Sequence, residues 1–171
     1  MSLRRVSIER LGDDGTFPNN EALPILVYRH AIDPSDGDPA AALERLFREN
    51  GWGGTWRNGI YSYHHYHSTA HEVLGIARGA ARVQLGGESG VVIDVAPGDV
   101  LVLPAGTAHK NLGSSSDFLV VGAYPEGQSY DMNFGHSGER PAADRNIEQT
   151  PIPRTDPVCG REGPLIEFWK R

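Results

Sequence analysis

The stretch GIYSYHHYHSTAHEVLGIARG, which runs from Gly59 to Gly79, decides how this chain folds. Four of the seven histidines of the chain fall within eight of its residues. Side chains alternate along a strand, so His65 and His67 are expected on one face, where two neutral imidazoles can bind one metal ion. His64 is then expected on the outer face, as a bystander. Chance clustering or surface placement of the histidines is the alternative.

Glu72 follows these histidines and shares a strand face with two apolar residues, Leu74 and Ile76. Those neighbours place the carboxylate in the interior, where an unpaired charge would cost several kcal/mol. Two partners remain open: a metal ion held together with the histidines, which we favour, or a buried arginine. Arg78 and Arg82 lie in or beyond the next turn, which weakens the second alternative.

The surrounding sequence predicts a mainly β fold. The 171 residues include 21 glycines and 12 prolines, more than an all-helical chain of this size would tolerate. Apolar residues recur with a period of two between glycine-rich turns, and no helix intervenes, which favours an antiparallel sandwich or jelly roll. Residues 86–90 are predicted to form a hairpin turn. The predicted strands of this region are residues 61–67, 72–77, 81–85, 91–95, 100–103 and 118–124.

A strand and one helix are predicted before this region. Residues 23–32 form a β-rich run. Asp38 is a good N-cap, Pro39 suits the first helical position, and apolar residues at three- and four-residue spacing continue until Gly51. The helix is therefore expected between Asp38 and Gly51.

We expect a single domain over residues 1–171. Its N-terminal strand and helix occupy residues 20–51, its barrel core about 55–125, and a C-terminal arm residues 126–171. Within the arm, residues 141–149 are predicted as a short helix and residues 165–169 as a docking segment. Whether the arm wraps over its own barrel or crosses a dimer interface stays open.

Composition excludes several classes of function. The net charge is −6 and no basic cluster interleaves with aromatic residues, so nucleic acid is not an expected partner. The longest apolar stretches are far shorter than the roughly 18 residues of a membrane span. The first residues lack the apolar core of a signal peptide, and the single cysteine, Cys159, cannot pair within the chain. A cytoplasmic protein is expected.

Two motifs resemble those of the cupin superfamily. Gly59-x5-His65-x-His67-x4-Glu72-x6-Gly79 is similar to the first cupin motif at every fixed position, and Gly98-x5-Pro104-x-Gly106-x2-His109 is similar to the second. The resemblance implies a double-stranded β-helix, or jelly-roll barrel, with the N-terminal helix and C-terminal arm attached. It also implies that His65, His67, Glu72 and His109 bind one divalent metal, and His109 gains its role only in this way.

Two further features qualify the resemblance. The second motif often continues to an asparagine four residues past its histidine, where this chain has Gly113. That departure puts a local hydrogen bond in doubt rather than the metal. HHYHSTAHEVLG, the preceding helix and Asp156-Pro-Val-x-Gly-x-x-Gly-Pro-Leu also resemble the YjlB-type bacterial cupins.

The leading functional interpretation is a metal-dependent enzyme that acts on a small organic molecule, as a dioxygenase, isomerase or decarboxylase. The alternative is a non-catalytic, metal-containing protein that binds a small molecule. The four ligands suit iron, manganese, nickel, cobalt or zinc. Tyr61 and Tyr63, on the face of the ligand histidines, and His71 are the candidate catalytic residues. Cupins commonly associate, so a homodimer is expected.

Overall fold

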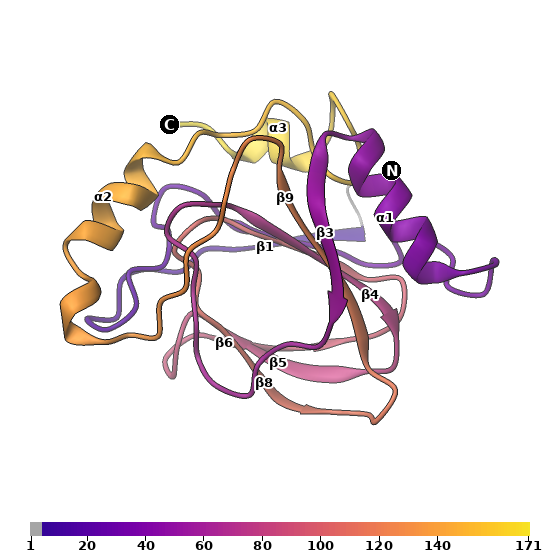
Figure 1. Cartoon of the computed structure of the whole chain (residues 1–171), viewed down its shortest axis with the longest axis horizontal. Coiled ribbons are helices and arrows are strands. Elements are labelled where there is room, and N and C mark those ends of the chain that lie inside the picture. The colour runs from indigo at the N-terminus through magenta and orange to yellow at the C-terminus, as the bar shows by residue number, and fades with distance from the viewer. Residues whose placement is uncertain (1–4) are drawn as a thin grey trace.

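Two antiparallel sheets form the body of the protein in a computed structural model, which describes residues 5–171 (Figure 1). The strand order is β1-β2-β7-β4-β9-β3 in the larger sheet and β6-β5-β8 in the smaller one. The nine strands of the described residues are β1 (Val6–Glu9), β2 (Ile25–Tyr28), β3 (Trp52–Asn58), β4 (Glu72–Arg78), β5 (Ala81–Leu85), β6 (Val91–Val95), β7 (Val100–Leu103), β8 (His109–Ser114) and β9 (Leu119–Pro125). This arrangement confirms the predicted mainly β fold.

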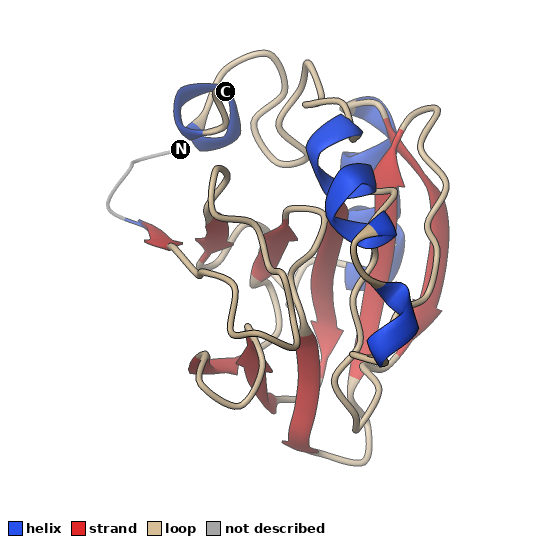
Figure 2. Ribbon diagram, turned by 90° about the vertical axis from the view of Figure 1, so that its left-hand side faces the viewer, coloured by secondary structure: helices blue, strands red, loops and turns tan. Residues whose placement is uncertain are grey.

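Helices lie outside the strands. They are α1 (Pro39–Glu49), the 3-10 turn Ser137–Glu139, α2 (Ala142–Gln149) and α3 (Pro164–Phe168). Figure 1 shows α1 and α3 on the outer side of the larger sheet, away from the smaller one, and Figure 2 shows the helices beside the strands from a second direction. Within the described part of the chain, no helix is both long and apolar enough to cross a membrane.

Strand β4 lies between β7 and β9 and separates two hydrophobic cores. Val73 and Ala77 belong to the core under α1, whereas Leu74 and Ile76 belong to the core between the sheets. Glu72 has the parity of the second pair, so its side chain points into the barrel, as the sequence predicts. A carboxylate is thus positioned in the interior by strand alternation alone.

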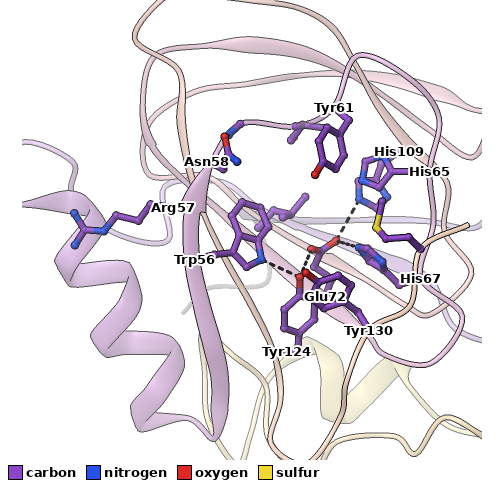
Figure 3. Close-up of a pocket in the computed structure, with 14 residues that line it drawn as sticks. Trp56, Arg57, Asn58, Tyr61, His65, His67, Glu72, His109, Tyr124 and Tyr130 are labelled. Carbon is purple, nitrogen blue, oxygen red and sulfur yellow. Dashed lines mark hydrogen bonds and ion pairs between the residues drawn. The ribbon is translucent and has the colours of Figure 1, made fainter. Parts of the chain in front are cut away.

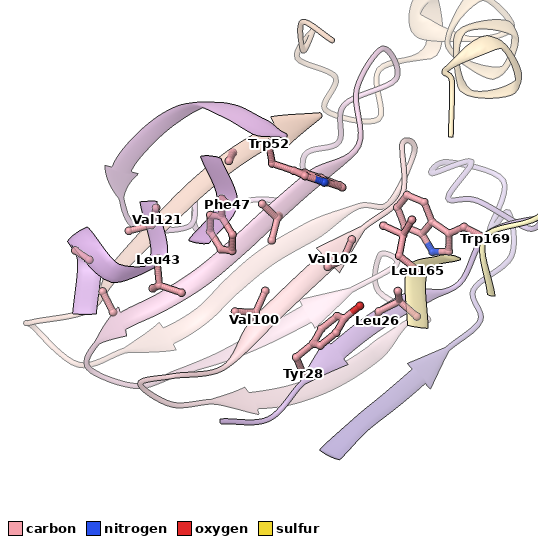
Figure 4. Packing of buried hydrophobic residues seen from close by; sticks show 14 of the residues in the cluster. Leu26, Tyr28, Leu43, Phe47, Trp52, Val100, Val102, Val121, Leu165 and Trp169 are labelled. Carbon is pink, nitrogen blue, oxygen red and sulfur yellow. The ribbon is translucent and has the colours of Figure 1, made fainter. Parts of the chain in front are cut away.

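Helix α1 begins and packs as predicted. The Asp38 side chain accepts hydrogen bonds from the backbone N–H groups of Ala40 and Ala41, at 3.0 and 3.2 Å, so it is the N-cap. Phe47 is fully buried (Figure 4). Gly75 of β4 permits this close packing, because a Cβ atom there would lie only 2.9 Å from Phe47 Cζ.

The C-terminal arm packs on the barrel of its own chain. Leu165 and Trp169 are buried in the same hydrophobic core as the side chains of α1, at its far end from Phe47, and the Trp169 indole donates a hydrogen bond to the Pro24 carbonyl at 2.8 Å (Figure 4). The predicted docking segment and the predicted short helix, now α2, are both confirmed.

The predicted strand at residues 61–67 is wrong. This segment pairs with β8 at Tyr61, which accepts from the Asn111 N–H, and at His65, which exchanges two hydrogen bonds with His109. The two contacts are four positions apart on the first segment and only two positions apart on β8, so a regular ladder cannot form. Strands β1, β3 and β8 were not predicted; β3 contains adjacent glycines, and β8 is largely polar.

Candidate metal centre

Three buried histidines converge at one end of the barrel interior (Figure 3). His65 and His67 come from the irregular segment before β4, and His109 is the first residue of β8. One nitrogen from each ring lies within 4.8 Å of the others, a grouping that could hold a metal ion. The bridge between His65 and His109 brings the two sequence motifs together.

Each of the three rings places Nδ1 against a backbone carbonyl oxygen. The pairs are His65 with Tyr63 at 3.2 Å, His67 with Asp131 at 2.6 Å and His109 with Thr107 at 3.0 Å. A carbonyl can only accept, so Nδ1–H is the donor, and in the neutral ring Nε2 keeps its lone pair. Outer-sphere bonds of this kind fix the tautomer and ring orientation of metal-binding histidines.

Glu72 completes the cluster. Its carboxylate is 3% exposed, and Oε2 lies 3.3 Å from His67 Nε2 and 3.2 Å from His109 Nε2. That oxygen makes no hydrogen bond of acceptable geometry. A buried anionic oxygen that faces two nitrogen lone pairs is unfavourable unless a cation lies among them. The donor set therefore fits a divalent metal.

The titration behaviour of the cluster agrees with this interpretation. Burial, reinforced by neighbouring His109, lowers the pKa of His65 to about 3. Burial is the largest single effect on His67 and opposes its protonation, but the charge and hydrogen bonding of Glu72 together with those of Asp131 outweigh burial and raise the pKa of His67 above its ordinary value. Burial would raise the pKa of Glu72, yet the facing imidazoles hold it below the ordinary range. The cluster attracts positive charge.

No buried arginine accompanies Glu72 among the residues that the structure describes. The basic side chains within 4.0 Å of the Glu72 carboxylate are the two histidines, and Arg82 instead pairs with Asp94 at the surface, at 2.9 Å. Arg78 is exposed. Within residues 5–171 the arginine alternative for Glu72 therefore has no support.

A cavity of about 370 Å³ opens beside the histidines. Its wall is rich in aromatic residues: Trp56, Tyr61, Tyr124 and Tyr130. Ile60, Leu74 and Met132 add apolar surface.

Tyr124 connects this wall to the carboxylate. Its hydroxyl accepts a hydrogen bond from the Trp56 indole at 2.8 Å and donates one to Glu72 Oε1 at 3.2 Å (Figure 3). Burial, then the charge of Glu72, raise the pKa of Tyr124 above its ordinary range, so this hydroxyl keeps its proton. Glu72 Oε1 therefore accepts a hydrogen bond from Tyr124, whereas Oε2 faces the histidines.

The three candidate catalytic residues lie in different surroundings. Tyr61 lines the cavity, whereas Tyr63 stacks on the Tyr61 ring and is not part of the lining. His71 is fully buried elsewhere: Nδ1 accepts from the Ala105 N–H at 2.9 Å, so Nε2–H donates to the Pro151 carbonyl at 3.0 Å. His71 thus has a structural place in the fold.

Burial lowers the pKa of His71 to about 3, so this imidazole stays neutral.

His64 is outside the cavity and contacts Glu88 Oε1 at 2.8 Å, consistent with the expected outer face.

Sequence reasoning missed Trp56, Tyr124 and Tyr130. Tyr124 could have been found, because it shares strand parity with Val120, which is buried between the sheets. Trp56 lies on the strand that was not predicted, and Tyr130 lies in an irregular part of the arm that carries no periodic signal.

Comparison with known proteins gives one extensive match. The uncharacterised protein YjlB of Bacillus subtilis (strain 168) is 43% identical over 157 residues, which cover 92% of each chain. No protein-family model matches the sequence.

Several solved structures are similar to part of the chain. Pumpkin seed globulin is 26% identical over 47% of this chain and 22% of its own, with a TM-score of 0.38. Acireductone dioxygenase from Bacillus anthracis, with cadmium in its active centre, is 13% identical over 54% of this chain and 63% of its own, also at 0.38. The chain thus spans less than two thirds of each, and at these TM-scores the likeness bears on neither ligand nor activity. On its match to YjlB, its two-sheet barrel and its two histidine motifs, the chain belongs to the YjlB family of cupins.

Proposed function

We propose that this protein is a metal-dependent enzyme that acts on a small organic molecule, with His65, His67, Glu72 and His109 as the ligands of one divalent metal. The observation that carries the proposal is the unbonded Glu72 Oε2, which faces the Nε2 atoms of two histidines in a buried site. Three imidazoles and one carboxylate suit iron, manganese, nickel, cobalt or zinc.

A bound metal of this kind supplies Lewis acidity or, if it is redox-active, oxygen chemistry. The reaction we propose is therefore an oxygenation, an isomerisation or a decarboxylation. The residues of the chain hold the site in place: the Nδ1–H groups of the histidines are fixed on carbonyls, and Tyr124 holds a proton beside Glu72. The aromatic wall offers apolar surface for a substrate beside the site.

Elemental analysis of untagged protein and calorimetric metal titration test the ligand set. The wild type is expected to bind one equivalent, and Glu72→Gln, which keeps the shape but removes the charge, should bind more weakly. His67→Ala should lose more than about ten-fold in affinity, because loss of even a supporting partner of a metal ligand costs 10- to 100-fold. His64→Ala removes a histidine of the same segment outside the cavity and serves as the control.

Equal metal affinity in wild type, Glu72→Gln and His67→Ala would refute the site and the enzymatic proposal with it. With the metal in place, substrate-dependent oxygen uptake identifies an oxygenase. Binding of small molecules without turnover would instead support the non-catalytic alternative.

A further inference from the structure

Two stacked tyrosine pairs flank the histidine cluster. Tyr61 stacks on Tyr63, with ring centroids 4.9 Å apart and planes 14° from parallel, and Tyr124 stacks on Tyr130 at 4.8 Å and 22°. The Tyr61 ring lies 5.1 Å from the His65 ring. The Tyr130 ring lies 5.0 Å from the ring of His67. Aromatic side chains therefore contact the candidate ligands from both directions.

Much of this aromatic surface is uncovered. Tyr61 and Tyr130 are 50% and 51% exposed, although both line the same concave cavity. Single exposed apolar residues need no explanation, but aromatic residues gathered around a cavity with a few polar groups are typical of small-molecule sites. At about 370 Å³ the cavity is at the small end of ligand pockets. It has room for a small molecule with a flat apolar part.

The charged side chains of the cavity limit which anionic groups a bound molecule can have. Arg57 is the one arginine or lysine among the described lining residues, and its guanidinium makes two hydrogen bonds to the Glu44 carboxylate, at 2.7 and 2.9 Å. Figure 3 shows Arg57 directed away from His65 and His67. Its charge is therefore already compensated, and a phosphate or second carboxylate would be buried in the cavity without a partner.

We propose that the cavity binds a single-ring aromatic molecule that presents one oxygen-donor group toward the histidines and has no second anionic group. This inference rests on the proposed metal-dependent function. Its chemical basis is the aromatic wall on both sides of the cluster, together with the absence of a free cation among the described residues of the lining. On the same ground, molecules whose second anionic group lies away from the histidines, such as sugar phosphates, are not expected as substrates.

Matched hydroxamates test the proposal. Acetohydroxamate and benzohydroxamate share one oxygen-donor group and differ in the aromatic ring, whereas 4-carboxybenzohydroxamate adds a second anionic group. Each is titrated into cobalt-loaded protein and followed by calorimetry and by the visible spectrum of the metal. Benzohydroxamate is expected to bind at least ten-fold more tightly than acetohydroxamate, and the added carboxylate should give no further gain.

Two variants test which residues of the protein contact the aromatic ring of benzohydroxamate. Tyr130→Ala should reduce the preference for benzohydroxamate to less than three-fold while cobalt binding persists. Phe134→Ala removes an exposed aromatic residue that does not line the cavity, so it should keep the wild-type preference.

Equal affinity for acetohydroxamate and benzohydroxamate in cobalt-loaded wild type would overturn the aromatic assignment alone. An unchanged preference in Tyr130→Ala would overturn the role of the tyrosine wall. Failure of the wild type to bind cobalt, iron, manganese, nickel or zinc would overturn both this inference and the proposed function.

Discussion

Replacing Tyr28 by phenylalanine removes one hydroxyl that ties the C-terminal arm to the larger sheet. Tyr28 lies on β2 and donates a hydrogen bond to Asp156 Oδ2 at 2.5 Å, and both residues are fully buried. The Asp156 carboxylate also accepts from the backbone N–H groups of Val158, Cys159 and Leu165, at 2.8, 2.9 and 3.0 Å. This carboxylate therefore joins β2 to the turn that precedes α3.

The expected loss of stability follows from these contacts. A hydrogen bond to a charged group contributes about 1.5–3 kcal/mol. Asp156 keeps its three backbone donors in Tyr28→Phe, so the charge is not left without partners and the loss should be about 2 kcal/mol. In a chain of 171 residues, each kcal/mol corresponds to roughly 2–4 °C in Tm, so the midpoint should fall by about 4–8 °C.

Urea unfolding at pH 7, followed by circular dichroism, measures the difference. Tyr66→Phe is the matched control, because Tyr66 has a fully buried ring but its hydroxyl lies 3.4 Å from Glu139, at the limit of a hydrogen bond. The control should lose less than about 1 kcal/mol of unfolding free energy. The slope of the unfolding free energy against urea concentration should be unchanged in both variants. A loss below about 0.5 kcal/mol in Tyr28→Phe would show that this bond does not hold the arm.

The other predictions concern the helix, its packing, pH and assembly. Asp38→Ala should lose about 1 kcal/mol in urea unfolding and leave metal binding unchanged, because it removes the N-cap. Gly75→Ala should lose about 1–3 kcal/mol, since its methyl group meets the side chains of α1, whereas Gly53→Ala, with open space around it, is the control. Burial, then the charge of Asp156, raise the pKa of Tyr28 above its ordinary range. An unfolded tyrosine loses its proton near pH 10, so the full contribution of Tyr28 is present below that pH. Above it, the contribution of Tyr28 should fall by about 1.4 kcal/mol per pH unit, so the loss of stability in urea titrations between pH 9 and 11 should be shallower in Tyr28→Phe by about that slope. The homodimer stays a prediction, which a monomer in light scattering at micromolar concentration would contradict.

The strands that sequence reasoning located are those whose packing imposes a clear pattern. Strand β7 is buried along its whole length, and β5 pairs β6 through a short glycine-rich turn, so residues 100–103, 81–85 and 91–95 were predicted with their observed bounds. Strand β8 has mostly polar, partly exposed residues. Its pairing with β5 depends on tertiary contacts, which no local pattern records.

The residues of the candidate site also differ in whether the sequence could predict their positions. The places of His65, His67 and Glu72 on one interior face follow from local alternation, although the segment of the two histidines is not a regular strand. His109 could be assigned through the motif resemblance only. Tyr130 could not be predicted at all, because its position depends on how the irregular arm returns over the barrel.

The register of three neighbouring strands explains how Glu72 comes to have one bonded and one unbonded oxygen. Trp56 on β3 and Leu74 on β4 are both paired with Gly122 on β9. A Cβ atom at Gly122 would lie 2.1 Å from Trp56 Cε2, so the indole can rest on β9 only because that position has no side chain. From there the indole donates to Tyr124, two residues along the same face, and Tyr124 donates to Glu72 Oε1. Since Oε1 is held in this way, the carboxylate cannot rotate freely, and Oε2 stays directed at the imidazole nitrogens. The sheet register therefore directs a single carboxylate oxygen at the two imidazole nitrogens.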